Sequence, residues 1–382
     1  MAAFAAVTTA KGIAAIAGIR LTGPDAAKII DHVFTPSAKD KHTEPGAIIV
    51  GDITDGTDSV DHIVLGCLAK DSFEINCHGN PLIVEMIMGI LKNHGAKLVT
   101  IEELLETQFT EHPSGNTIAA EAQLTQLKAA SLTGVKLIAS QPTTGLGKAA
   151  RDWLSQIDAI TLEDVRAQCQ DILNTSRTAE LLITGARVVI AGPANSGKST
   201  LLNALAGRQK AIVSHIPGTT RDWVSAEFTT PLLCMELIDT AGFDEALTAA
   251  SRVDANSQDV TTRLIEDCDL ILCVFDSTVP IPKLPLPENK KTLVVFNKLD
   301  LRPAADQSHI ELAFADSVAV SAKTGEGLPL LVDKISRLLV PDSFDPTQPA
   351  CFTPRQKDII TRLSTAKTKP AIEPLITELL NG

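Results

Sequence analysis

The sequence predicts a protein of mixed α/β and α+β class that is built from several domains. Short apolar runs alternate with helix-like stretches in residues 1–115, which predicts an N-terminal α+β module. Strong helix formers dominate residues 116–185, which predicts the first part of a helical domain. Five β-branched runs, most of them separated by helical segments, occupy residues 186–340, a pattern typical of an inserted, doubly wound α/β domain with a mostly parallel sheet.

Residues 341–382 are expected to form a linker and the second part of the helical domain. The linker begins at Pro341 and is punctuated by further prolines, and the stretch after it is typical of one or two helices with breaks at Pro370 and Pro374. At about 150 residues per domain, the length of 382 residues agrees with two or three domains.

Two helices have recognisable start signals. Residues 81–94 begin with a proline, which suits the first helical turn, and Ile83, Ile87 and Leu91 recur every four residues. Thr161 is expected to cap another helix, because it opens a capping-box pattern.

Composition and charge exclude several classes of protein. Lys and Arg total 34 against 46 Asp and Glu, and the net charge of −12 argues against non-specific coating of nucleic acid. No apolar run approaches about 20 residues, and the first residues lack the basic leader of a secretory signal, so we expect a cytoplasmic protein. The seven cysteines include no CxxC pair, which indicates reduced, mostly buried thiols rather than a disulfide framework or a zinc site.

A phosphate-binding loop is predicted after the β-branched run that ends at Ala191. Residues 192–200 fit the pattern G-x4-G-K-[ST], and helix-forming residues follow. The glycines of such a loop let backbone N–H groups wrap a diphosphate at a helix N-terminus, where the helix dipole favours anions. Lys198 is expected to reach the β- and γ-phosphates, and the Ser199 hydroxyl to ligate Mg²⁺.

Two switch-like motifs follow the loop in the order that a GTPase needs. Residues 218–222 are predicted to close over the γ-phosphate, with the Thr220 hydroxyl on Mg²⁺. Residues 239–242 end an apolar strand, which places the Asp239 carboxylate near the metal and the Gly242 amide near the γ-phosphate. Lys198, Thr220, Asp239 and Gly242 are therefore the predicted catalytic residues.

Two further motifs indicate that the base is guanine. Asp300, in the stretch 297–300, is placed to accept the N1–H and N2 amino hydrogens of guanine, which adenine does not offer. Residues 321–323 follow another strand and are expected to offer backbone N–H groups to the guanine O6. Five motifs in this order favour GTP over ATP. The predicted GTP contacts are Asn195, Ser196, Gly197, Lys198, Ser199, Thr200, Ser214, His215, Ile216, Pro217, Gly218, Thr219, Thr220, Asp239, Thr240, Ala241, Gly242, Asn297, Lys298, Asp300, Ser321, Ala322 and Lys323.

The chain also resembles a known family, the MnmE (TrmE) tRNA-modification GTPases. Residues 193–199, 211–222 and 239–242 are similar to that family's nucleotide-binding motifs. In the N-terminal module, residues 18–25 resemble the family's IRxSGPDA stretch, and residues 73–81 resemble its EIxxHGGP stretch. The order of domains is similar as well, with a GTPase domain inserted into a helical domain. The chain is identified as a divergent member of this family.

The resemblance implies a homodimer formed through the N-terminal module and a GTPase stimulated by K⁺. It also implies a flavin-containing partner subunit, with which the family modifies the wobble uridine of tRNA using a one-carbon unit from a reduced folate. Arg20 and Glu74 match the family's folate-contacting positions. The implied K⁺ ligands are Asn195, Ser214, Ile216 and Thr219, and K⁺ would take the place of an arginine finger.

One departure from the family lies in the second switch region. The family places a glutamate about twelve residues after the switch aspartate, but this spacing from Asp239 leads to Ser251 and Arg252. Glu245 or Asp254 is the candidate replacement after a shift of the loop. Slow intrinsic hydrolysis of GTP is therefore expected.

The folate and tRNA signals depart from the family too. Residues 113–118 lack the basic residue found there in the family, so a structural role for Arg20 and Glu74 stays open. The sequence has no Cys-Ile-Gly-Lys type motif in residues 379–382, and Cys351 is its last cysteine. Two functions stay open: a GTPase of tRNA wobble-uridine modification, and a regulatory, GTP-dependent dimerisation switch that hydrolyses GTP slowly and has lost the tRNA chemistry.

Overall fold

The computed structural model shows two compact units, Met1–Ser114 and Gly115–Gly382, which we describe separately. The structure describes residues 3–10, 12–38, 44–56, 58–111, 116–207, 213–214, 224–239, 264, 266–280, 290–302 and 317–382.

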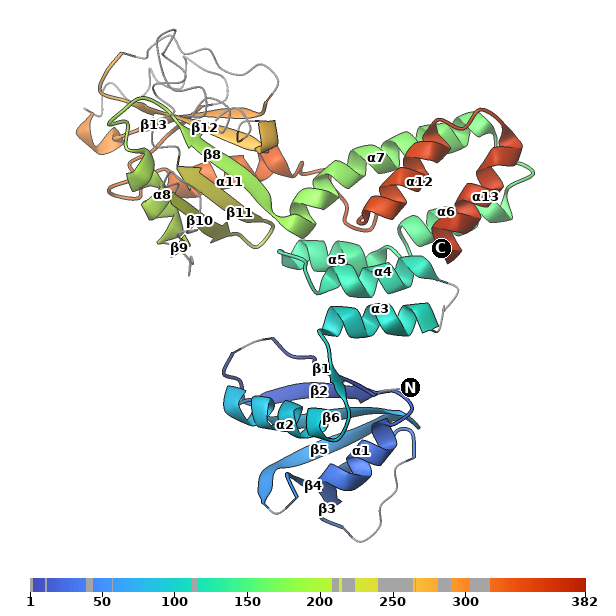
Figure 1. The fold of residues 1–382 in the computed structure, drawn as a ribbon. Coiled ribbons are helices and arrows are strands. Elements are labelled where there is room, and N and C mark those ends of the chain that lie inside the picture. The colour runs from blue at the N-terminus through green and yellow to red at the C-terminus, as the bar shows by residue number, and fades with distance from the viewer. Residues whose placement is uncertain are drawn as a thin grey trace, which may run out of the picture. The chain divides into compact units, whose positions relative to one another are not determined.

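The first unit is an α+β module built on one sheet (Figure 1). The strand order in the sheet is β3-β4-β5-β6-β2-β1-β7, and the pairs are antiparallel except for β1 with β7. Its elements are β1 (Phe4–Val7), β2 (Ile16–Thr22), α1 (Ala26–Val33), β3 (Phe34–Pro36), β4 (Ile48–Thr54), β5 (Ser59–Ala69), β6 (Ser72–His78), α2 (Pro81–Asn93), β7 (Lys97–Leu98) and α3 (Ile101–Glu111). The predicted helix at residues 81–94 is confirmed as α2, which Asn80 caps by accepting a hydrogen bond from the Leu82 N–H.

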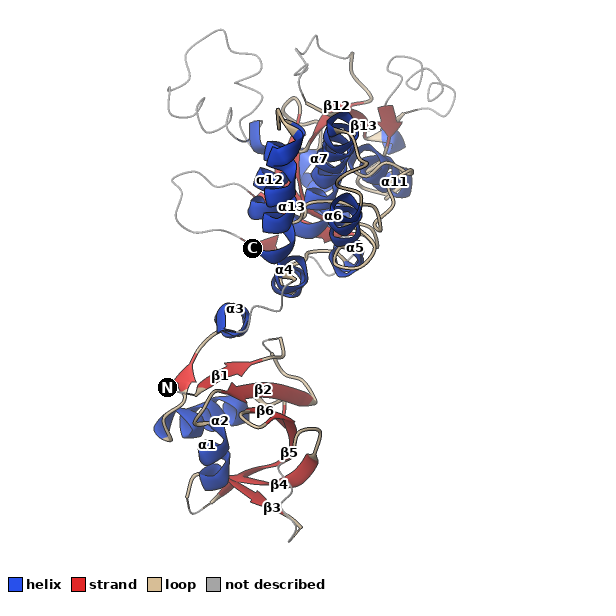
Figure 2. Ribbon diagram, turned by 90° about the vertical axis from the view of Figure 1, so that its right-hand side faces the viewer, coloured by secondary structure: helices blue, strands red, loops and turns tan. Residues whose placement is uncertain are grey.

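The two faces of this sheet differ in what covers them. Inward-facing residues such as Ile19 and Ile75 form one core with apolar residues of α1 and α2, which lie on one side of the strands (Figure 2). The opposite face carries a row of exposed apolar side chains, which the strand register places on one side. These are Ile16, Ile48, Val50, Val64 and Leu68.

The second unit contains the predicted α/β domain. Its sheet has the order β14-β13-β12-β8-β11-β10-β9, in which β14 to β11 are parallel and β10 and β9 are antiparallel. The elements are β8 (Ala186–Ala191), α8 (Lys198–Ala206), β9 (Val213–Ser214), β10 (Val224–Thr229), β11 (Cys234–Asp239), β12 (Leu270–Asp276), β13 (Thr292–Asn297), η1 (Leu299–Leu301), β14 (Ser317–Ala319) and α11 (Leu328–Leu339).

Side chains of the central strand β8 point alternately to the two faces of the sheet, and both faces are covered. Val188 and Ile190 of β8 join the core that contains apolar residues of α8 and α11, whereas Val189 and Ala191 join a second core on the other face. A sheet that is buried on both faces is typical of doubly wound α/β proteins, so the predicted class is confirmed. The parallel strands bring their carboxyl ends to one edge, where ligands bind in such folds.

The helical part of the second unit comes from both sides of the α/β domain in the sequence. Its elements are α4 (Thr117–Gln126), α5 (Leu132–Ser140), α6 (Leu146–Ser155), α7 (Leu162–Thr184), α12 (Pro354–Ser364), η3 (Lys369–Ala371) and α13 (Ile372–Asn381). Apolar residues of α6 and α7 share one core with those of α12 and α13, and these helices lie side by side in Figure 1. The predicted cap of α7 is confirmed, because Thr161 Oγ1 accepts a hydrogen bond from the Asp164 N–H.

A half-buried ion pair ties the two halves of the helical part together. The Arg355 guanidinium of α12 donates to both oxygens of Glu121 in α4, at 2.7 and 2.8 Å. Arg355 also donates to the backbone oxygens of Glu378 and Leu379, near the end of α13. One side chain thereby holds three helices.

Residues 341–353, which we call the strap, connect α11 to α12 and are pinned to the helices. The fully buried Gln141 donates to the Gln348 backbone oxygen and accepts from the Ala350 N–H, at 3.0 and 2.9 Å. Ser176 Oγ accepts from the Cys351 N–H at 2.8 Å. The linker expected from its prolines therefore has a fixed path.

One expected helix break is wrong. Pro370 lies in η3 between α12 and α13, as predicted, but Pro374 lies inside the first turn of α13. The first-turn N–H groups of a helix have no intrahelical acceptor, so a proline is tolerated there. Among the helices within the described ranges, none has the length and apolar character needed to cross a membrane.

Candidate nucleotide-binding site

The loop after β8 has a backbone that only glycine permits at two positions. Gly192 has φ +146, and a Cβ there would overlap the backbone oxygen of Val274 in β12. Gly197 has φ +91 directly before α8, and a Cβ there would overlap the side-chain amide of Asn297. The loop can therefore pack against β12 and β13 while the N-terminus of α8 stays open to an anion.

The charged and hydroxyl groups of this loop lie beside the end of β11. Lys198 Nζ donates to the Gly192 and Pro193 backbone oxygens, at 2.7 and 3.1 Å. Ser199 Oγ donates to Asp239 Oδ2 at 2.5 Å. Asp239 is 4% exposed, and its other oxygen has no hydrogen-bond partner among the described residues.

A hydroxyl and a half-satisfied carboxylate fit a hard divalent cation such as Mg²⁺. Within the described part of the chain, no three His, Cys, Asp or Glu side chains gather into a metal site. Protein Mg²⁺ sites commonly use only one or two carboxylates and take their remaining ligands from phosphates and water. Ser199 and Asp239 therefore match a cation that is bound together with a phosphate ligand.

Asn297 connects the P-loop to the loops that follow β13 and β14. Its side-chain amide donates to the Ser196 backbone oxygen at 3.0 Å and lies 3.4 Å from that of Gly197. Its side-chain oxygen accepts from the Ala322 N–H at 3.0 Å, and the residue is 2% exposed. A single buried side chain thus fixes three loops relative to one another.

Asp300 and Ser321 form the second link between these loops. Ser321 Oγ donates to Asp300 Oδ1 at 2.6 Å and accepts from the Thr324 N–H at 3.1 Å. Within the described residues, the other oxygen of the exposed Asp300 has no hydrogen-bond partner, so it can accept hydrogen bonds from a ligand.

Lys298, between these two residues, makes a contact that sequence patterns did not indicate. Its backbone has φ +65, and its ammonium lies 2.7 Å from Asp276 Oδ2 at the end of β12. Burial alone would raise the pKa of Asp276, but hydrogen bonds from Lys298 and Thr278 outweigh it and lower that pKa below its ordinary value. Asp276 is the last residue of β12 and lies opposite Asn297 in the β12–β13 register, so strand pairing, which no sequence motif encodes, brings it beside Lys298.

The structure gathers part of the predicted site. Fourteen predicted residues are described around the ends of β8, β11, β13 and β14 or, for Ser214, in β9: Asn195, Ser196, Gly197, Lys198, Ser199, Thr200, Ser214, Asp239, Asn297, Lys298, Asp300, Ser321, Ala322 and Lys323. The remaining predicted residues lie outside the described ranges: His215, Ile216, Pro217, Gly218, Thr219, Thr220, Thr240, Ala241 and Gly242. The switch candidates Glu245 and Asp254 also lie outside them.

In the first unit, the two residues matched to folate contacts bind each other. The β2–β6 register places Arg20 opposite Glu74, and Arg20 Nε donates to Glu74 Oε2 at 2.6 Å. Thr8 Oγ1 donates to Glu74 Oε1 at 2.8 Å. Both carboxylate oxygens therefore have partners within the sheet.

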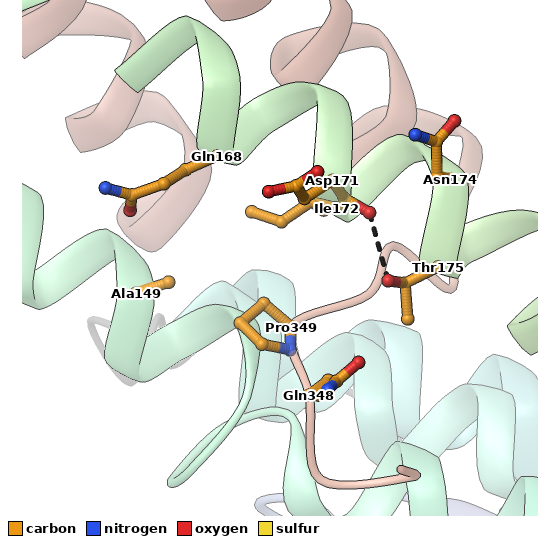
Figure 3. Close-up of a pocket in the computed structure, with 8 residues that line it drawn as sticks. All are labelled: Ala149, Gln168, Asp171, Ile172, Asn174, Thr175, Gln348 and Pro349. Atoms are coloured by element: carbon orange, nitrogen blue, oxygen red, sulfur yellow. Dashed lines mark hydrogen bonds between the residues drawn. The ribbon is translucent and has the colours of Figure 1, made fainter. Parts of the chain in front are cut away.

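The helical part has a cavity of its own, of about 480 Å³, between α6, α7 and the strap (Figure 3). No predicted site residue lines it. The thiol of Cys351, in the same part, is buried, and burial raises its pKa to about 11. A thiol that stays protonated at neutral pH is a poor nucleophile.

The chain is similar to two described families and to several known proteins. Residues 187–298 match a family described as 50S ribosome-binding GTPase, and residues 3–110 match one described as GTP-binding protein TrmE N-terminus. The tRNA modification GTPase MnmE of a Thermotoga species is 30% identical, over 87% of this chain and 81% of that protein. MnmE of Salinibacter ruber is 32% identical, over 78% and 73%. Among solved structures, the G domain of the FeoB iron transporter of T. maritima is 26% identical with a TM-score of 0.31, covering 40% of this chain and 98% of that domain.

Proposed function

The chain belongs to the MnmE family, and we propose that it uses its GTPase cycle to drive the modification of tRNA at the wobble uridine. It binds and hydrolyses GTP, as its GTPase domain and its MnmE relatives indicate. The observation that carries the residue assignments is the set of hydrogen bonds made by the buried Asn297 side chain, which we call the Asn297 hub. It joins the P-loop to both candidate guanine loops. We assign phosphate binding to Lys198 and the P-loop amides, and base recognition to Asp300 and Ala322.

Mg²⁺ is proposed to bind Ser199, with Asp239 beside it and Thr220 completing the protein ligands. The half-satisfied Asp239 carboxylate and its 2.5 Å contact with Ser199 support this assignment. When bound, the metal would neutralise charge that develops on the phosphates during hydrolysis. Lys198 would contribute a second positive charge, fixed at the start of α8.

K⁺ is proposed to bind Asn195, together with Ser214, Ile216 and Thr219. Asn195 is exposed at the P-loop with φ +62, so its carboxamide is accessible to a cation next to the phosphate site. GTP hydrolysis in K⁺ against Na⁺ tests this assignment. We expect a K⁺ preference that Asn195→Ala abolishes, and equal rates in both salts would contradict it.

A homodimer through the first unit is proposed from the exposed apolar row on its sheet. Burying side chains such as Ile48 and Val50 against a second copy would remove them from water, which favours association. Val50→Glu should convert the dimer to a monomer in light scattering, whereas Lys92→Glu, at an exposed position of α2 on the other face of the sheet, should not. A Val50→Glu protein that remains dimeric would refute this interface.

The tRNA step is tested directly in cells. We propose that the protein acts in the cytoplasm with a flavin-containing partner subunit and a reduced folate. Deleting the gene should remove the wobble-uridine modification from bulk tRNA, and a plasmid copy should restore it. If the wobble uridine stays unmodified in a strain that carries only Lys198→Ala, the GTP site is needed for the modification.

A second function, a regulatory dimerisation switch without tRNA chemistry, is favoured by one observation. Glu74 is fully bonded by Arg20 and Thr8, which suits a structural ion pair as well as a ligand site. Titration with a reduced folate separates the two: binding that Glu74→Gln weakens supports the folate role. No binding, together with unchanged tRNA in the deletion strain, would support the switch.

The proposed domain boundaries are 1–115, 116–185, 186–340 and 341–382. The shared core of α6, α7, α12 and α13 supports treating the second and fourth segments as one helical domain.

A further inference from the structure

The side chain of Lys298 lies along the P-loop and is fixed at both ends. Its backbone sits in the left-handed region directly after Asn297, which the P-loop carbonyls hold. Its ammonium binds Asp276, and its Cε lies 4.0 Å from the position a Cβ would take on Gly197. The methylene stem therefore runs beside the loop.

Asp276 is itself held in place by a turn that follows β12. Its Oδ1 accepts from the Thr278 N–H at 2.9 Å and from Thr278 Oγ1 at 2.6 Å, which leaves Oδ2 for Lys298. The Ser277 N–H donates to the Asn297 backbone oxygen at 2.9 Å, so the turn is also tied to β13. The Asp276 side chain is 17% exposed, which reduces screening of its charge by solvent.

We propose that Asp276 is a positioning residue for guanine-nucleotide binding, because it holds Lys298 against the P-loop before the nucleotide arrives. A lysine side chain has many rotamers, and a ligand that must order it binds more weakly. An already ordered lysine next to the Asn297 hub removes that cost. The inference rests on GTP binding at this site and adds a residue outside the five nucleotide-binding motifs.

The test is nucleotide affinity in a double-mutant cycle. Asp276→Asn keeps the acceptor for Thr278 but removes the charge, and we expect GDP to bind about tenfold more weakly, as for loss of a half-buried charged hydrogen bond. The KM for GTP should rise similarly, while kcat stays within about twofold, because the contact is made in ground state and transition state alike.

The second arm uses Lys298→Met, which keeps an unbranched stem and removes the ammonium. If Asp276 acts through Lys298, Asp276→Asn should cause no further loss of affinity in the Lys298→Met background. An equal loss in both backgrounds, or no loss in the wild-type background, would overturn the proposal.

A further variant covers the case in which Asp276→Asn does not fold. Thr278→Val leaves the charge of Asp276 but removes one of its anchors, so a partial loss of about threefold in GDP affinity is expected. It carries the test if Asp276→Asn does not fold, and unchanged affinity in Thr278→Val would then refute the proposal.

The control for specificity is Asp152→Asn, which breaks an exposed ion pair with Lys148 on α6 and should leave GDP affinity unchanged. A loss in that variant as large as in Asp276→Asn would show that the effect is not specific to the site.

Discussion

Replacing Asn297 by alanine should uncouple the P-loop from the two loops after β13 and β14 that we propose bind guanine. The wild-type carboxamide donates to the Ser196 backbone oxygen and accepts from the Ala322 N–H, both at 3.0 Å, and the residue is 2% exposed. Alanine makes neither bond, and at this depth water cannot replace them freely. The loss should therefore appear in nucleotide binding, since the three loops would no longer share one fixed arrangement.

The magnitude follows from the number of bonds and their burial. A typical net hydrogen bond contributes about 1 kcal/mol, and a buried N–H left without an acceptor costs about 1–3 kcal/mol. For Asn297→Ala, the lost hydrogen bond and the unpaired N–H together cost about 3 kcal/mol. If the whole effect falls on binding, the dissociation constant for GDP rises roughly 100-fold.

The assay is displacement of a fluorescent GDP analogue, with thermal unfolding measured in parallel without nucleotide. Asn174→Ala, an exposed amide on α7, is the matched control and should change neither quantity. If Asn297→Ala binds GDP within about threefold of wild type and unfolds at the same temperature, the hub is not what holds the site together.

Three further predictions concern other parts of the fold. Gln141→Leu leaves the buried polar groups of the strap without partners and should lower the free energy of unfolding by about 3 kcal/mol in urea, while Gln170→Leu, exposed on α7, should change it little. Burial raises the pKa of Cys169 from 9.0 to about 12 and that of Cys351 to about 11, so the stability they contribute is complete below pH 9 and falls as pH rises toward 11 and 12. Thermal melts from pH 7 to 11 should show this fall, with a smaller slope in Cys169→Ala, and an unchanged slope would contradict it. Gly192→Ala would push a Cβ into a β12 carbonyl, and a strain of about 1–2 kcal/mol should weaken GDP binding about tenfold with little loss of helix content by circular dichroism.

Much of the nucleotide site could be predicted because its motifs are local. Each motif lies within a few residues at the end of a buried strand, and parallel strands bring such ends to one edge of the sheet. The strap at residues 341–353 shows the opposite case. Its prolines predicted a linker, but its fixed path depends on Gln141, which lies about two hundred residues earlier in the chain.

Contacts set by strand register could not be predicted from the sequence alone. Arg20 and Glu74 are 54 residues apart and meet only because β2 pairs with β6 in one register. Asp276 meets Lys298 through the register of β12 with β13. Strands β9 and β10 were not predicted either, because Val224–Thr229 is short and half polar and lies toward an edge of the sheet.

The most direct test of the account is the base preference of Asp300→Asn. In the proposed assignment, the wild-type Asp300 carboxylate accepts hydrogen bonds from the N1–H and amino group of guanine, whereas xanthine carries an oxygen in place of that amino group. We predict that the wild-type protein binds GDP in preference to ADP and XDP, and that Asp300→Asn prefers XDP. An Asp300→Asn protein that still prefers GDP to XDP would contradict the assignment of the loops after β13 and β14 to guanine recognition.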